Sequence, residues 1–194
     1  DHTATYEEIK KWYNSDIPFH TYTTSSTVNL GLYAIDNQSG IDKMRISNDG
    51  TNYISWQNYS KNKSWDLQGG NGERKVYVQY KDKAGNISSF SDIIKLDTDE
   101  PTGSIEINDG DFYTSNTSVN LNLTASDNYS GLYGMCFSND GINYTEWEEY
   151  NNTKGWTLPL GNGEKTIYYK LRDKAGNIVT YSDNITVDST YPFG

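Results

Sequence analysis

The sequence has little of what catalysis, sulfur ligation or membrane insertion requires. Its 194 residues include one cysteine and two histidines, and only 34% of them are hydrophobic. One cysteine cannot form a disulfide within the chain or furnish a zinc site. No apolar run approaches the roughly 20 residues of a membrane-spanning helix. The chain carries 16 basic and 26 acidic residues, which argues against nucleic-acid binding, since that usually needs a basic face.

Aromatic residues, by contrast, are plentiful. The chain contains 17 tyrosines and 5 tryptophans, although its mean hydropathy is -0.81. A chain this rich in aromatic side chains does not have the composition of a disordered protein. The composition instead predicts small domains with aromatic cores and polar surfaces, either one domain or two of about 95 residues.

The second half of the chain repeats the first. Val28–Asp97 aligns without a gap with Val119–Asp188, and 36 of the 70 positions are identical. The motifs that recur at an offset of 91 residues are AIDNQSG and ASDNYSG (Ala34–Gly40, Ala125–Gly131), SNDG (Ser47–Gly50, Ser138–Gly141) and KDKAGN and RDKAGN (Lys81–Asn86, Arg172–Asn177). Such self-similarity predicts a duplicated domain.

The repeat fixes the expected domain boundaries. An acidic segment ending at Pro101 closes the first copy, and its counterpart ends at Pro192. We therefore expect domains at residues 1–98 and 99–194, with a non-repeating lead at 1–24. A linker that ends in proline is stiff, and its second copy suggests a longer array. Charge is uneven, because residues 1–98 carry a net charge of -1 and residues 99–194 a net charge of -9.

Within each copy, apolar residues alternate with mostly polar ones. Val28, Leu30 and Leu32 show this period of two, which is typical of a strand with one buried face. Each copy reads as about seven short strands with turn signals every 8–12 residues. The pattern predicts an all-β protein of two tandem antiparallel β-sandwiches of the immunoglobulin or fibronectin III type. The lead segment departs from it: Thr5–Glu8 fits a helix capping box, so this segment is either a short helix or a remnant of a preceding segment.

The order of these motifs resembles a known family. The chain resembles bacterial and archaeal Ig-like surface repeats, grouped with Big-type or fibronectin III-like modules. The motifs that carry the resemblance are, in order, DNxSG, MxxSNDG, a tryptophan, GxGx followed by lysine or arginine, YxxxxDKAGN, and an Asp-Thr or Asp-Ser pair with a proline three positions after it. The resemblance covers roughly residues 25–192. It implies tandem sandwiches in long extracellular proteins such as adhesins, surface-layer proteins or secreted polysaccharide-degrading enzymes, and it implies no catalysis.

A calcium site is one hypothesis for the acidic residues. In a sandwich of this order, the loops holding Asp127 and Asp173 lie at the end where the linker with Asp97, Asp99 and Glu100 enters. Converging carboxylates would repel one another, and calcium, which accepts 6–8 oxygen ligands, would relieve that repulsion. The alternative is that Asp127, Asp173 and their copies only bond neighbouring backbone amides in turns.

An aromatic set offers a second candidate site. Tyr144, Trp147 and Tyr150 could stack on a carbohydrate, but Tyr53, Trp56 and Tyr59 recur at the matching positions, as packing would also demand. Neither His2 nor His20 has an identifiable catalytic partner. Ten Asn-X-Ser/Thr triplets, consistent with a glycosylated surface, begin at Asn37, Asn58, Asn62, Asn86, Asn116, Asn122, Asn128, Asn143, Asn151 and Asn184.

Two functions follow from these patterns. The first is a non-catalytic spacer within a secreted or cell-surface protein, whose partners are neighbouring domains and whose stiffness linker calcium would set. The second is a carbohydrate- or protein-binding accessory module of a secreted polysaccharide-degrading enzyme. The two copies discriminate between them: a spacer should be uniform, whereas a binder often concentrates unusual aromatic residues or charge in one copy.

Overall fold

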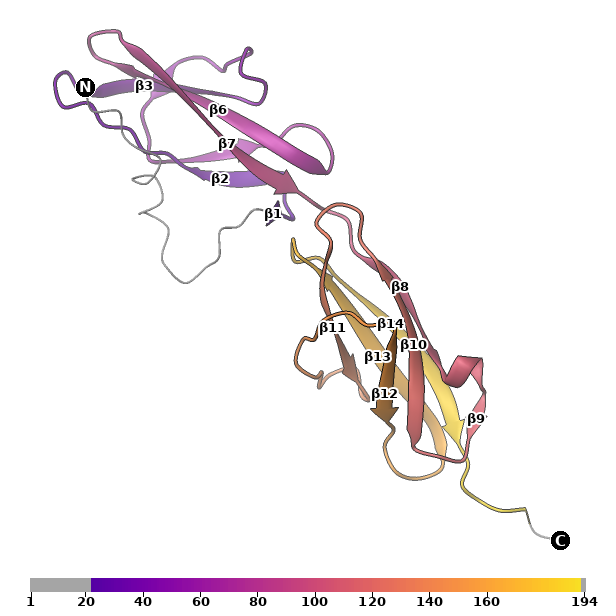
Figure 1. Cartoon of the computed structure of the whole chain (residues 1–194). Coiled ribbons are helices and arrows are strands. Elements are labelled where there is room, and N and C mark those ends of the chain that lie inside the picture. The colour runs from indigo at the N-terminus through magenta and orange to yellow at the C-terminus, as the bar shows by residue number, and fades with distance from the viewer. Residues whose placement is uncertain (1–21, 193–194) are drawn as a thin grey trace. The chain divides into compact units, whose positions relative to one another are not determined.

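The computed structural model describes residues 22–192, which form two compact units divided between Asp97 and Thr98 (Figure 1). The segment expected to be a helix or a remnant, Thr5–Glu8, lies outside the described residues. Regular structure in residues 22–192 is almost all β-strand. No helix in residues 22–192 is long and apolar enough to cross a membrane.

Unit 1 contains two antiparallel sheets with one short parallel pairing. Its strands are β1 (Tyr22–Thr23), β2 (Thr27–Gly31), β3 (Ile41–Ser47), β4 (Gln57–Asn58), β5 (Asn62–Asp66), β6 (Gly72–Asp82) and β7 (Ile87–Leu96). One sheet has the order β1-β7-β6-β3-β4, and the other joins β2 to β5. Strand β1 runs parallel to β7, whereas the remaining pairs are antiparallel.

Unit 2 has the same plan with one additional strand at its start. Its elements are β8 (Thr102–Ile107), the 3-10 turn η2 (Asn108–Gly110), β9 (Tyr113–Thr114), β10 (Ser118–Ser126), β11 (Leu132–Ser138), β12 (Thr153–Thr157), β13 (Gly163–Asp173) and β14 (Ile178–Val187). The sheets have the orders β11-β13-β14-β9 and β12-β10-β8. Strands β9 to β14 correspond to strands of unit 1 at the 91-residue offset, whereas β8 has no counterpart among the described residues.

The alternating residues of the strands build the core of each sandwich, as the period of two predicts. In unit 2, Leu121 and Leu123 of β10 face Ile167, Tyr169 and Leu171 of β13, and all five are 3% exposed or less. In unit 1, Met44, Ile46 and Tyr80 are buried in the same way, with Leu30 and Leu32 half-buried against them.

The SNDG motif forms the turn that follows β3 and β11. Asp49 accepts backbone hydrogen bonds from Thr51 (2.8 Å) and Asn52 (2.7 Å), and Asp140 makes the same bonds in unit 2. Gly50 adopts a φ of 76°, a left-handed conformation that suits glycine. The motif recurs because its side chains hold the turn closed.

Candidate functional site

The acidic residues of unit 2 gather at two loops that follow β10 and β13. Carboxylate oxygens of Asp127 and Asp173 lie within 4.8 Å of each other, and Asp173 is fully buried. A hollow of about 440 Å³ next to Asp127 is lined by Asp99 and Glu100 of the linker. The structure therefore places Asp99, Glu100, Asp127 and Asp173 at one end of unit 2.

The fifth predicted ligand, Asp97, is the last residue of unit 1. Its backbone amide donates a hydrogen bond to the carbonyl of Thr23 at 2.9 Å, which ties the end of β7 to β1. Because Asp97 stands two residues before Asp99, their Cα atoms can be at most about 7 Å apart. Covalent connection alone thus keeps Asp97 near the linker carboxylates.

These loop carboxylates also close turns, in both units. Asp173 accepts the amides of Gly176 (2.6 Å) and Asn177 (2.8 Å) and the side-chain amide of Asn177 (2.7 Å). Asp127 accepts the amide of Gly131. Hydrogen bonds hold the carboxylates in place. Oδ1 of Asp173 accepts two backbone amides, which use both of its lone pairs, so a cation would bind Asp173 through Oδ2.

The copies in unit 1 show the electrostatic effect of this arrangement. A backbone hydrogen bond from Gln38 lowers the pKa of Asp36, and a side-chain hydrogen bond from Asn86 lowers the pKa of Asp82. Donors directed at a carboxylate favour its charged form. Turn capping therefore occurs at both loops of unit 1.

The three aromatic residues proposed as a stacking platform do not share one surface. Tyr150 packs against the core of unit 2, and its hydroxyl donates to the carbonyl of Leu123 at 3.1 Å. Tyr144 is covered by Lys170, whose ammonium lies 3.8 Å from the ring centroid. Burial raises the pKa of the Tyr144 hydroxyl. Tyr150 is thus a packing residue, and one face of Tyr144 is already occupied by a cation.

Trp147 belongs instead to a cluster that the sequence reading missed. It meets Tyr133 edge to face, with ring centroids 6.4 Å apart. The guanidinium of Arg172 lies 4.2 Å from the ring centroid of Tyr133 and 5.6 Å from that of Trp147. Tyr133 is 51% exposed, and unit 1 has Asp42 at its position. That difference between the copies is the signal that could have identified it.

Unit 1 keeps the cation–π contact from the strand that corresponds to β13 and adds contacts from another strand. Lys81 of β6, the copy of Arg172, lies 4.7 Å from the ring centroid of Trp56. Arg45 of β3 lies 4.8 Å from the ring of Tyr53 and 4.5 Å from that of Trp56. Unit 2 has Cys136 in place of Arg45, and there the cations come from Lys170 and Arg172 of β13. Each contact of this type contributes about 0.5–1 kcal/mol at exposed sites.

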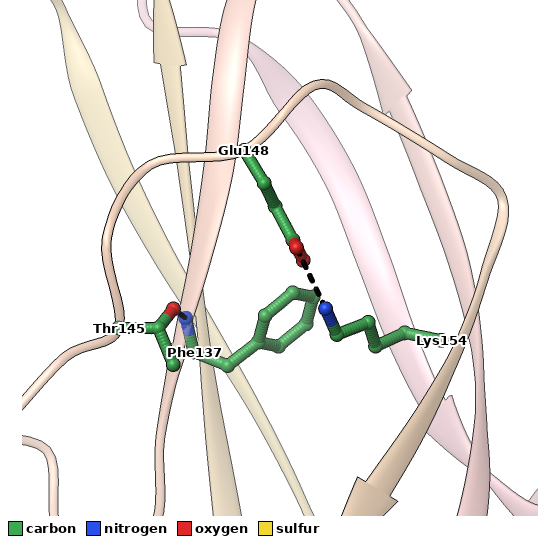
Figure 2. A network of polar contacts seen from close by, with 4 residues as sticks. All are labelled: Phe137, Thr145, Glu148 and Lys154. Atoms are coloured by element: carbon green, nitrogen blue, oxygen red, sulfur yellow. Dashed lines mark hydrogen bonds and ion pairs between the residues drawn. The ribbon is translucent and has the colours of Figure 1, made fainter.

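A second difference between the copies lies in a polar network beside the core (Figure 2). Lys154 pairs with Glu148 at 2.6 Å, and its ammonium lies 5.8 Å from the ring centroid of Phe137. Thr145 accepts the amide of Phe137 at 3.1 Å in the same network. In unit 1 the corresponding contact is a hydrogen bond from Lys63 to Gln57 at 3.2 Å.

The described residues offer little for nucleophilic catalysis. Both histidines, His2 and His20, lie outside them. The only cysteine, Cys136, is 2% exposed, and burial raises the pKa of its thiol. A reactive cysteine needs a thiolate and access to substrate, so Cys136 is a buried packing residue.

Comparison with known proteins places the fold. No protein-family model matches the chain, and no curated protein matches it significantly. Among solved structures, the fibronectin(III)-like modules of Clostridium thermocellum CbhA superpose with a TM-score of 0.52 at 15% identity, over 86% of this chain and 87% of theirs. The PKD1 domain of Vibrio anguillarum Epp covers 47% of this chain and 98% of its own (TM-score 0.37, 15% identity). A tetra-tandem repeat from the extending region of a large adhesion protein covers 86% and 51% (TM-score 0.34, 15% identity).

Proposed function

We propose that the chain is a non-catalytic spacer within a secreted or cell-surface multidomain protein. The observation that carries the proposal is the repetition of the same framework bonds in both units. The indole of Trp65 donates to the side-chain carbonyl of Asn48 and that of Trp156 to Asn139, each at 2.8 Å. A spacer requires folded units that resist extension, and this shared framework meets that need without a catalytic group.

Pulling the full chain from its two ends in a force-spectroscopy experiment tests the spacer. We expect two separate unfolding events, one for each unit, because each sandwich has its own core. A chain that extends without a resolved event from either unit would contradict the proposal. Binding of a soluble ligand is not required by it.

We further propose that calcium binds at the acidic end of unit 2. Asp127 and Asp173 supply ligands from the two loops, and Asp99 and Glu100 supply ligands from the linker, with Asp97 as the remaining candidate. Calcium prefers several carboxylate oxygens in flexible geometry. Bound ion would hold the linker against the loops of unit 2 and so stiffen the start of this unit.

Thermal melting of the full chain with calcium and with EDTA tests this site. We expect calcium to raise the melting temperature of unit 2, by mass action on the folded form. Asp127→Asn should abolish the calcium-dependent increment, whereas its matched copy Asp36→Asn in unit 1 should leave the increment intact. Equal melting with and without calcium would overturn the site but not the spacer.

The cluster of Tyr133, Trp147 and Arg172 favours carbohydrate binding as a second candidate function. Its exposed member, the aromatic Tyr133, is present in only one unit, as expected of a binding surface. Pulldown on insoluble polysaccharides would test it: retention that Tyr133→Ala abolishes and Tyr53→Ala does not would favour a binding module over a spacer.

A further inference from the structure

The outer face of the larger sheet of unit 1 is basic. Val78 and Tyr80 of β6 are buried in the core, so the residues that alternate with them lie on the opposite face. The register of β6 with β3 and β7 aligns the outward-facing residues of all three strands. The basic residues on this outer face, which we call the basic face, are Lys43, Arg45, Lys75, Lys81 and Lys95. Two carboxylates lie beside them, Glu73 opposite Lys95 and Asp42 next to Lys43.

The matching sheet of unit 2 forms without most of these cations. At the five corresponding positions, unit 2 has Gly134, Cys136, Thr166, Arg172 and Thr186. Lys170, in place of Gln79, adds a second cation to Arg172. Because β13 pairs with β14 in the same register as β6 with β7, the two faces differ in their side chains and not in their strand pairing. The fold itself therefore does not require the cations of unit 1.

The basic face has few carboxylates of its own to pair with. Among the ion pairs within residues 22–192, it takes part in one, which joins Lys43 to Asp42 at 4.0 Å. The cations of Arg45 and Lys81 instead lie 4.5 Å and 4.7 Å from the ring centroid of Trp56. Two cations on one indole repel each other, and a carboxylate bound between them would relieve that repulsion. The basic face is thus suited to an anionic ligand.

The cations of the basic face form a strip along the strands. Lys75 and Lys81 are six residues apart on β6, which corresponds to about 20 Å at the rise of a strand. Arg45 pairs with Gln79, one step of two residues from Lys81, and Lys95 lies one step beyond Lys75. Each such step is about 7 Å. A strip of this length on the face of a sheet fits an extended polymer with acidic groups at intervals better than it fits one small anion.

We propose that the basic face of unit 1 binds an anionic polysaccharide whose sugars carry carboxylates. Ammonium and guanidinium groups form charge-assisted hydrogen bonds with carboxylates. Ser89 and Ser91 of β7, exposed between the two ends of the strip, offer hydroxyls to the sugars. DNA, with one charge per about 1.7 Å of its axis, would be repelled more strongly by a chain of net charge -10 than a sparsely charged glycan. The site lies on the other unit from the Tyr133 cluster and does not rest on it.

Calorimetric titration of the full chain with polygalacturonate tests the basic face, in EDTA so that calcium does not bridge carboxylates. We expect binding that weakens with added salt, because the contacts are ionic, and no binding of the same polymer once its carboxylates are methyl-esterified. Lys75→Thr combined with Lys95→Thr gives unit 1 the residues that unit 2 has at these positions. This variant should bind polygalacturonate about tenfold more weakly, since it loses two ionic contacts at exposed sites.

The control lowers the net charge by the same amount away from the basic face. Lys61→Thr combined with Lys174→Thr changes two exposed lysines of loops and should leave the affinity nearly unchanged. Tyr133→Ala should also leave it unchanged, which separates this site from the aromatic cluster of unit 2.

Three outcomes would overturn the proposal. The first is no binding of polygalacturonate, or equal binding of its methyl ester. The second is an equal loss of affinity in the loop-lysine control, which would mean that net charge alone governs binding. The third is binding of single-stranded DNA as tight as that of polygalacturonate, which would identify a nucleic acid as the fitting partner.

Discussion

In unit 2, β8 covers one side of the core, whereas the described residues of unit 1 include no strand at the matching edge. The burial of core residues also differs between the two units. Leu30 and Leu121 are identical in type and position, yet Leu121 is fully buried and Leu30 half-buried. Ile185 is 1% exposed, while its copy Ile94 is half-buried. The difference teaches that identical residues at matching positions of the two units are not buried to the same extent, so sequence identity alone does not fix burial.

The largest expected effect comes from weakening the additional strand of unit 2. Ile107→Ala removes a side chain that is fully buried, and such substitutions cost about 2–5 kcal/mol because they lose apolar burial and leave a cavity. We expect the urea midpoint of unit 2 to fall accordingly. Labelling of the buried thiol of Cys136 by a maleimide reports the opening of this unit alone, since the chain has no other cysteine.

The control for this prediction is an isoleucine of the same unit whose side chain is exposed to solvent. Ile142 is 81% exposed, so Ile142→Ala should leave the labelling midpoint nearly unchanged. If Ile107→Ala also left it unchanged, β8 would not be the reason that the core of unit 2 is more complete than that of unit 1.

Much of this fold could be predicted from the sequence, because strand residues repeat with a period of two and every described strand except β4 and β8 occurs in both units. The aromatic residues of loops were harder to place. Trp147 and Tyr150 stand three residues apart outside any long strand, so no periodicity tells which one faces the core. Tyr150 packs inward, whereas Trp147 meets Tyr133 and Arg172. The alternation of residues within one strand also cannot predict which strand pairs with it, so the partners of β2 could not be read from the sequence.

A matched pair of tyrosines tests whether the shared framework is equally strong in both units. The hydroxyl of Tyr150 donates to Leu123 at 3.1 Å and that of Tyr59 to Leu32 at 3.2 Å. Tyr150→Phe should cost about 1 kcal/mol, the net contribution of a typical hydrogen bond. Tyr59→Phe should cost about 2 kcal/mol, because the Tyr59 hydroxyl also accepts the amide of Ala34 at 3.2 Å. Urea unfolding of Tyr59→Phe and Tyr150→Phe measures both. A loss in only one unit would show that the bond depends on how complete the sandwich is.

Exchanging glutamate and glutamine between the two units at the Lys154–Glu148 pair should have a smaller effect on stability, and the exchange can be made in both directions. Glu148→Gln converts the ion pair of unit 2 into the hydrogen bond of unit 1, and Gln57→Glu does the opposite. Both side chains of the pair are about a third exposed, at 31% and 37%, so each exchange should change the free energy of unfolding by less than about 1 kcal/mol. Added salt should lower the free energy of unfolding of a unit that carries the ion pair, and it should not affect the same unit when glutamine replaces the glutamate. An ion pair insensitive to salt would contradict this view of the contact.

The smallest effect concerns acid, and it should be the same in both units. Side-chain hydrogen bonds from Asn52 and Asn143, followed by backbone hydrogen bonds, hold the pKa values of Asp49 and Asp140 well below the ordinary value. A carboxylate with a lowered pKa in the folded state stabilises that state above its unfolded pKa of about 3.9, and the benefit is lost as pH falls through the folded pKa.

Asp140→Asn should therefore flatten the fall in the urea midpoint of unit 2 below about pH 4, and Asp49→Asn should do the same for unit 1. A flattening in one unit only would mean that the two SNDG turns, identical in their hydrogen bonds, differ in how strongly they hold their carboxylates.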